Sequence, residues 1–316
     1  MCHSALSSGI DERILGASTI CAVGSHLSRQ ISQWHPWLFA ARSAELRFER
    51  RLSDRVRRVP FAQTVADTSL PVTLVRHASV LRRRLLDLDP RLQETKIVNL
   101  RLAAATIDGL LIRPGETFSF WDRVGAPIAE RGFVEGLILR GGRITAGIGG
   151  GLCQLSNLLY WMALHTPLEV VEQHHHGFDP FPDVGRVLPF GSGATIFWNY
   201  GDLRLANPTD QPLQLCARVG STRLHGAVRT DRPWPVAYHV EEDGHRFVRE
   251  ADGVVYRENE LWRRTVDRRT GDTVERTLLT RNHAIVGYPV PDGLIEAISS
   301  RPPDASLVGN GGIRAR

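Results

Sequence analysis

The chain has 316 residues, of which 42% are hydrophobic and 23% are charged, and its formal net charge is +5 at pH 7. These fractions are those of an ordinary soluble globular protein that can bury a core. No stretch approaches the roughly 18 consecutive apolar residues that a membrane-spanning helix requires, so we expect no transmembrane segment.

The apolar run from Ile14 to Gly24 has the length of the central part of a secretory signal. Asp11 and Glu12 stand where such a signal carries positive charge, however, and Gly16 and Ser18 interrupt the run. We therefore expect the protein to remain in the cytoplasm.

The pattern from Ser28 to about Arg58 predicts a helix, and its second half, Arg42 to Arg58, is rich in arginine. A basic helix without interleaved aromatic residues or a recognisable docking motif is more often a solvated face than a nucleic-acid interface. We therefore expect no nucleic-acid partner. A mixed segment with Pro60 and Pro71 follows, and we assign residues 1–94 to an N-terminal helical extension.

The next predicted helix covers Lys96 to Leu110, because apolar residues recur there at helical spacing: Ile97, Leu100, Ala104 and Ile107. Asp108-Gly109 offers a stop for this helix. After the Pro114-Gly115 turn, the run from Thr117 to Trp121 predicts a strand.

A glycine-rich turn, Gly147 to Gly151, leads into Cys153 and then into an apolar run with helical spacing that ends at Thr166-Pro167. Glycines permit unusual backbone angles and the close approach of a ligand to the main chain. Cys153 is therefore expected at a helix N-terminus, where the helix dipole favours the thiolate and free N–H groups could hold an oxyanion.

The following segment, Leu168 to His176, alternates as a strand and places His174 and His176 on one face. A cysteine that opens a helix beside a histidine on a neighbouring strand is the general plan of papain-like and transglutaminase-like thiol enzymes. In that interpretation Cys153 is the nucleophile and a histidine acts as base and then as acid.

Three other interpretations remain open. The cysteine and the glycines could serve packing alone. Cys153, His174 and His176 could supply three metal ligands, although the spacing matches no established metal motif, and we expect neither a metal nor another cofactor. The segment could also belong to a non-catalytic binding module in which aromatic residues hold a ligand: Phe118, Phe120 and Trp121.

The remaining cysteines, Cys2, Cys21 and Cys216, fall at unrelated spacings with no C-x-x-C pair. This pattern argues against a zinc ribbon and against a disulfide framework. Cys216 alternates into an apolar strand, where a small buried side chain is expected.

After Asn207-Pro208 the chain changes to short alternating segments separated by turn residues, which predict β-hairpins. Leu261 to Val266 and Val274 to Thr280 are expected to form one antiparallel pair. We divide the chain into residues 1–94, a core domain at 95–220, a β-rich region at 221–290 and a disordered tail at 291–316. The fold class is α+β, with the cysteine-bearing helix packed on a sheet.

The chain resembles the VanW family of glycopeptide-resistance clusters over roughly residues 95–290. Gly149-Gly150-Gly151-Leu152-Cys153-Gln154 matches the family signature G-G-G-x-C-Q, and His176 matches its recurrent downstream histidine. His174 occurs in part of the family. Gly193 departs from the pattern, because the family usually has an acid there. If that acid orients the histidine, this chain either uses another group, such as Asp179, Asp183 or Asp202, or has lost activity.

The resemblance implies a soluble accessory protein of glycopeptide (vancomycin) resistance or of cell-wall peptide metabolism, with a small-molecule or peptide substrate of cell-wall origin. The favoured hypothesis is Cys/His-dependent acyl transfer or amide hydrolysis, with Cys153, His176 and His174 as catalytic residues. The substrate-binding residues are expected in the segment that surrounds the cysteine: Gly149, Gly150, Gly151, Gln154, Ser156 and Asn157.

Overall fold

A computed structural model describes residues 36–82, 90–140, 143–175, 177–179, 182, 187–198 and 201–297. The chain forms two compact units, residues 1–58 and 59–316. In the first unit, helix α2 (Pro36–Arg57) confirms the helix expected up to about Arg58. The apolar run from Ile14 to Gly24 lies outside the described residues.

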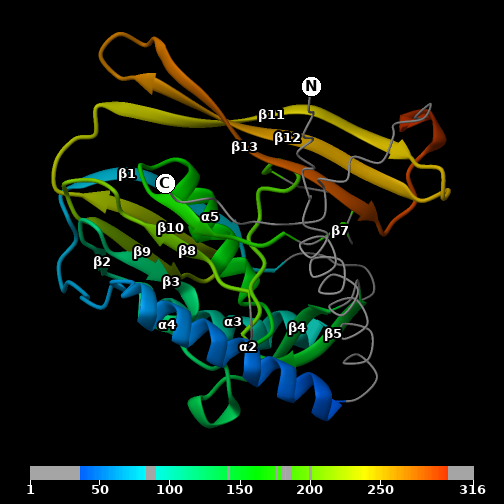
Figure 1. Ribbon diagram of the computed structural model, residues 1–316, viewed down its shortest axis with the longest axis horizontal. Coiled ribbons are helices and arrows are strands. Elements are labelled where there is room, and N and C mark those ends of the chain that lie inside the picture. Colours follow the sequence, from blue (N-terminus) through cyan, green and yellow to red (C-terminus); the bar gives the residue numbers. More distant parts are fainter. Residues whose placement is uncertain are drawn as a thin grey trace, which may run out of the picture. The chain divides into compact units, whose positions relative to one another are not determined.

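The second unit is built around a four-stranded antiparallel sheet of order β1-β10-β9-β2 (Figure 1). The strands are β1 (Val72–Val80), β10 (Arg223–Thr230), β9 (Leu213–Val219) and β2 (Leu110–Ile112). Their inward side chains, including Leu213, Leu215, Leu224 and Val228, are fully buried. The alternate side chains of β9 and β10 form the outer face of this central sheet.

Helices α3 (Pro90–Ile107) and α5 (Cys153–Leu164) pack on the inner face of the central sheet. Helix α5 confirms the helix expected after the glycine-rich turn. The helix expected over Lys96 to Leu110 is present as α3, but it begins at Pro90 and ends at Ile107, and Leu110 begins strand β2. Leu100 of α3 and Leu155 of α5 have no exposed surface and belong to one continuous core. A Cβ on Gly226 of β10 would lie 2.6 Å from the Met162 methyl group, so the absence of a side chain there lets α5 approach the sheet closely.

A three-stranded sheet, β3 (Thr117–Ser119), β8 (Arg204–Ala206) and β6 (Glu169–Glu172), lies beside this core. The expected strand from Thr117 to Trp121 was too long by two residues. Ser119 Oγ accepts a hydrogen bond from Asp122 N, and this cap begins the short helix α4 (Phe120–Val124). The hairpin of β4 (Glu135–Arg140) and β5 (Arg143–Ile148) precedes the glycine-rich turn.

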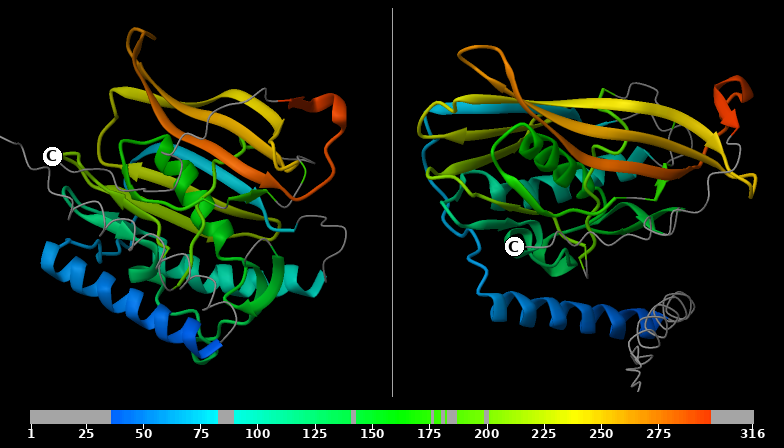
Figure 2. Two further views of the ribbon diagram at one scale, coloured as in Figure 1. Left: turned by 45° about the vertical axis from the view of Figure 1, so that its right-hand side comes forward. Right: turned by 45° about the horizontal axis from the view of Figure 1, so that its top comes forward.

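The C-terminal sheet has the order β14-β11-β12-β13-β7. Its long strands are β11 (Val236–Arg249), β12 (Val255–Asp267) and β13 (Thr273–Val286), and its short edge strands are β7 (Phe178–Asp179) and β14 (Ile295–Ala297). The expected hairpin is confirmed, because Leu261 pairs with Thr280 and Val266 pairs with Thr273. Figure 2 shows α5 between this sheet and the central sheet, and Val240 and Leu279 pack against the core.

The fold is therefore α+β, with the cysteine-bearing helix packed on a sheet and a β-rich C-terminal region, as expected. The central sheet includes β1, which precedes residue 95, and β10, which follows residue 220, while the proposed domain boundaries stay a prediction. Of the expected tail, 3-10 helix η2 (Asp292–Leu294) and β14 are ordered elements, and residues 298–316 lie outside the described residues. No described helix is both long and apolar enough to span a membrane.

A buried ion pair ties the edge strand β7 to the C-terminal sheet. Arg257 Nη1 of β12 lies 3.0 Å from Asp179 Oδ2 of β7, and the two side chains are only 3% and 4% exposed. The guanidinium also lies over the rings of Phe190 and Phe247, at 4.6 and 5.4 Å from their centroids. The Tyr288 hydroxyl donates a second hydrogen bond to the same carboxylate oxygen. Asp179 and Arg257 thus form a buried ion pair whose cation packs against aromatic rings.

Replacing Arg257 with methionine should lower the free energy of unfolding by about 3–5 kcal/mol, because it leaves the Asp179 carboxylate buried without its cation. Urea unfolding followed by circular dichroism measures the change. The matched control is Arg232→Met, whose partner Asp210 is 77% exposed and whose loss should cost about 0–1 kcal/mol. If both variants lose the same small amount of unfolding free energy, the buried Asp179–Arg257 pair does not stabilise the fold as predicted.

Candidate functional site

The glycine-rich turn places Cys153 by packing directly against backbone. A Cβ on Gly150 would lie 2.1 Å from the carbonyl carbon of Gly136 in β4, a separation at which no side chain fits. Gly149 and Gly151 have φ angles of 77° and 90°, in the left-handed region that favours glycine. Asn99 of α3 donates hydrogen bonds to the carbonyls of both Val134 and Gly150. The turn is therefore a rigid platform for the start of α5.

The N–H groups of the three glycines already have acceptors within the turn and β4. Gly149 N donates to Val134 O at 3.0 Å, Gly151 N donates to Leu137 O at 2.9 Å, and Gly150 N donates to Gly147 O at 3.0 Å. In contrast, the N–H groups of Leu152 and Cys153 have no acceptor on another residue of the described chain. These two groups, rather than the glycines, are available to an oxyanion.

The Cys153 thiol lies half-buried at the first position of α5. Its Sγ is 4.0 Å from the carbonyl oxygen of Ile196. Burial raises the pKa of Cys153, which is opposite to the direction expected from the helix N-terminus alone. The group is therefore a thiol at neutral pH, and a base must remove its proton before it can act as a nucleophile.

The segment from Gly193 to Phe197 joins Cys153 to the histidine run. Ser156 Oγ donates to Ala194 O at 2.6 Å, and Ala194 N donates to Asn157 Oδ1 at 2.7 Å, so α5 holds one side of this segment. On the other side, Thr195 N donates to His174 O at 2.8 Å. Cys153 and His174 thus contact two adjacent residues of one segment, Ile196 and Thr195.

His174 has a carboxylate partner that the sequence analysis did not name. Its Nε2 lies 2.9 Å from Glu172 Oε1. Glu172 is fixed in turn, because the same oxygen accepts a hydrogen bond from Asp202 N and Oε2 lies 3.4 Å from Arg204 Nε. The strand expected over Leu168 to His176 is shorter in the structure, because β6 ends at Glu172 and His174 forms an isolated bridge with Thr195. The two-residue spacing of Glu172 and His174, which places both side chains on one side of an extended chain, was visible in the sequence.

The replacement acids considered for the Gly193 position have other partners. Asp202 accepts hydrogen bonds from Ser119 Oγ at 2.6 Å and from Trp121 N at 3.1 Å, and burial raises its pKa. Asp179 is bound to Arg257. Asp183 lies outside the described residues. Glu172 is therefore the acid that the described structure places beside a histidine of this run.

The other predicted catalytic histidine, His176, lies outside the described residues. Its neighbour His175 is exposed and its Nε2 lies 3.5 Å from Thr280 Oγ1 of β13. Gly177 O accepts a hydrogen bond from Ile285 N, so the chain on either side of His176 is held along β13. No three His, Cys, Asp or Glu side chains of the described ranges are grouped as metal ligands, and the three-ligand alternative with His176 stays a prediction.

Each residue expected to bind substrate has an internal contact in the structure. Besides the glycines, Ser156 and Asn157, Gln154 Nε2 donates to Ser79 Oγ and to Val80 O of β1, at 2.9 Å each. These contacts position the start of α5. A role in substrate binding stays a prediction for all six residues.

Of the three aromatic residues expected to hold a ligand in the binding-module interpretation, only Trp121 is partly exposed. Phe118 and Phe120 are fully buried in the core and cannot meet a ligand. Trp121 is half-buried, donates from Nε1 to Gly201 O at 2.8 Å and packs edge-to-face on Trp198, with ring centroids 5.3 Å apart. A Cβ on Gly201 would lie 3.4 Å from the His174 ring, so this tryptophan pair lies near the Glu172–His174 pair.

Because burial raises its pKa, Cys153 should be alkylated slowly at neutral pH, with a half-maximal rate above the ordinary thiol value of about pH 8.5. Iodoacetamide labelling across a pH series, read by peptide mass spectrometry, measures this. His174→Gln should leave the profile in place if the resting cysteine is a neutral thiol. A half-maximal rate well below pH 8.5 in the unmodified protein would show a preformed thiolate instead.

A family model described as VanW like protein matches residues 95–229. The chain is 33% identical over 266 residues to the Vancomycin B-type resistance protein VanW of Enterococcus faecalis, covering 84% of this chain and 96% of that protein. It is also 32% identical over 123 residues to the uncharacterized protein YoaR of Bacillus subtilis, covering 38% of each chain. No solved structure gives a significant match.

Proposed function

The chain belongs to the VanW family, and on that premise we propose that it is a thiol-dependent acyl-transfer or amide-hydrolysing protein that acts on a cell-wall peptide or a related amide. The observation that supports the proposal is that Cys153 Sγ contacts Ile196 O while the main chain of His174 contacts the adjacent Thr195, and the His174 ring is paired with Glu172. The name of the Enterococcus relative extends it to an accessory role in glycopeptide resistance.

In the proposed reaction, a histidine of the run removes the proton of Cys153, and Sγ attacks the carbonyl carbon of the substrate amide. The N–H groups of Leu152 and Cys153 hold the developing oxyanion. The C–N bond then breaks, and the leaving amine takes the proton back from the histidine, which leaves a thioester. Water completes hydrolysis, or a second amine completes acyl transfer, and either one restores the thiol.

Because its pKa is raised, Cys153 needs a general base to become a nucleophile. A neutral, half-buried thiol reacts only if a positioned base takes its proton as the C–S bond forms. His174 is the base that the described structure supports, since the hydrogen bond to Glu172 orients its ring. His176, which matches the family's recurrent histidine, is the second candidate. With the protein in the cytoplasm, the substrate is an intracellular cell-wall precursor.

The rival function is a non-catalytic binding module for such a precursor. The observation that favours it is the partly exposed Trp121–Trp198 pair beside the histidine run, because aromatic faces hold apolar and sugar groups without any chemistry. In that case Cys153 would serve packing and its replacement would leave ligand binding unchanged.

Incubating the protein with soluble cell-wall stem peptides should give an adduct on Cys153 with the mass of one acyl group, together with cleaved or transferred product. Intact-protein and peptide mass spectrometry detect both. Cys153→Ala should abolish adduct and product, while the matched control Cys216→Ala should keep them. Peptide binding by Cys153→Ala with no adduct or product in the unmodified protein would support the binding module and overturn the enzyme.

Glu172→Gln should lower kcat by about 10-fold or more and leave KM nearly unchanged, because the histidine loses the carboxylate that orients its ring. His174→Gln should cost about 100-fold or more in kcat. Steady-state kinetics with the stem peptide measure both. If His174→Gln keeps the full kcat, His176 rather than His174 is the general base, and Glu172 has no role in the mechanism.

A further inference from the structure

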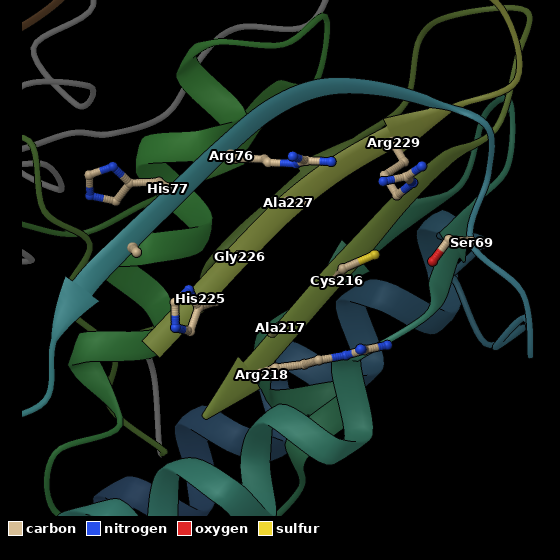
Figure 3. A pocket seen from close by; sticks show the side chains of 11 residues that line it. Ser69, Arg76, His77, Cys216, Ala217, Arg218, His225, Gly226, Ala227 and Arg229 are labelled. Carbon is tan, nitrogen blue, oxygen red and sulfur yellow. The ribbon is translucent and has the colours of Figure 1, made fainter. Parts of the chain in front are cut away.

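The outer face of the central sheet, opposite α5, carries a hollow of about 440 Å³ (Figure 3). Its lining brings together cationic and small side chains from three strands: Arg76 of β1, His225, Ala227 and Arg229 of β10, and Cys216 and Arg218 of β9. We call these six residues the basic hollow. His77 extends away from the others in Figure 3 and packs near Trp161, with ring centroids 6.2 Å apart.

Strand register explains how the cations surround small residues. Arg76 and Cys216 are the direct partners of Ala227 on its two sides, and His225 is paired with Arg218. Residues two apart on a strand share a face about 7 Å apart, so His225 and Arg229 flank Ala227 along β10. Ala227 and Cys216 thus form a low floor that is surrounded by three arginines and His225.

The charges of the basic hollow are only partly compensated. No aspartate or glutamate occurs among its described lining residues. Arg218 Nε binds Asp108 Oδ2 at 2.9 Å, which leaves its two terminal nitrogens without a bond within the described chain. Arg76 has one long hydrogen bond, 3.4 Å to Thr73 Oγ1. Three arginines therefore face one nearby carboxylate.

One wall of the hollow is held in place before any ligand arrives. Arg229 donates from Nη1 to Thr73 Oγ1 at 2.8 Å, from Nη2 to Pro71 O at 3.2 Å and from Nε to Leu70 O. All three acceptors are uncharged, so these bonds fix the guanidinium without neutralising it. A fixed, uncompensated arginine loses little conformational freedom when it binds an anion.

We propose that the basic hollow binds a compact phosphate-bearing ligand. Arginine forks match the geometry of phosphate oxygens and give strong, charge-assisted hydrogen bonds. The volume suits a small molecule rather than a polymer. The described lining has no phenylalanine, tyrosine or tryptophan on which nucleic-acid bases could stack. Because α5 packs on the other face of the sheet, this site is separate from the one at Cys153.

Cys216 on the floor gives a direct readout in the full chain. Bound phosphate should shield this half-buried thiol, and its negative charge should raise the thiol pKa, so both effects slow alkylation. Adding inorganic phosphate or pyrophosphate should therefore slow the labelling of Cys216, while Cys153 keeps its rate. Sodium chloride at equal ionic strength is the reference, because it screens charge without supplying phosphate.

Arg76→Gln should weaken the protection of Cys216 by pyrophosphate about tenfold, because it removes a cation without an acidic partner among the described residues. The matched control is Arg223→Gln, which removes the same charge from the outer face of β10 outside the lining. The control should change the protection less than about twofold, because Arg223 lies outside the lining and salt screens its charge from the hollow.

Three results would overturn the proposal. The first is labelling of Cys216 that phosphate and pyrophosphate leave unchanged. The second is an equal effect of Arg76→Gln and Arg223→Gln, which would show a general charge effect. The third is protection by phosphatidylglycerol-containing vesicles but not by pyrophosphate, which would identify the face as a surface for an anionic membrane. Thermal unfolding of both variants checks that each keeps its fold.

Discussion

The start of α5 depends on a backbone contact that admits no side chain. Gly150 lies directly against Gly136 of β4, and Asn99 of α3 bonds the carbonyl oxygens on both sides of this contact. The position of Cys153 follows from it, as does the orientation of the first free N–H groups of the helix. The glycine-rich turn thus acts through packing, because the N–H groups of its three consecutive glycines already donate hydrogen bonds to backbone carbonyls. In the proposed function, the N–H groups of Leu152 and Cys153, which have no acceptor on another described residue, hold the developing oxyanion.

The C-terminal sheet supports the other half of the site. The Asp179–Arg257 pair fixes the chain just after the histidine run, and Asn259 Nδ2 donates to Phe190 O at 2.8 Å just before the segment that contacts Cys153. Asn282 donates to Asn259 Oδ1 at 2.7 Å and extends this polar ladder across β12 and β13. The catalytic elements of the proposed function are therefore held by β12, whose Arg257 and Asn259 lie 78 and 69 residues after their partners Asp179 and Phe190 in the chain.

The two faces of the central sheet have different chemistry. Its inner face is apolar, packs on α3 and α5, and so determines where the thiol lies. Its outer face carries arginines around small residues, because side chains alternate between the two faces of a strand. One sheet therefore positions a candidate reaction centre on one side and a candidate phosphate site on the other. The two faces are linked by a hydrogen bond, because Gln154 of α5 donates to Ser79 of β1.

Local pattern in the sequence was enough to predict α3, the helix that begins at Cys153, the β12–β13 hairpin and the α+β class, because period and turn chemistry are properties of neighbouring residues. The strand at Thr117 was predicted too long because a side-chain cap at Ser119 ended it. The spacing of two residues between Glu172 and His174 could have been noticed in the sequence. Nothing in the local sequence showed, however, that the Glu172 carboxylate would contact the His174 ring. Only the tertiary structure decided the direction of the Cys153 pKa shift, the use of the glycine N–H groups and the ring of cations around Ala227. Each of these depends on burial or on strand register between segments up to about 150 residues apart, and such contacts are fixed by packing of the whole core rather than by any short stretch of sequence.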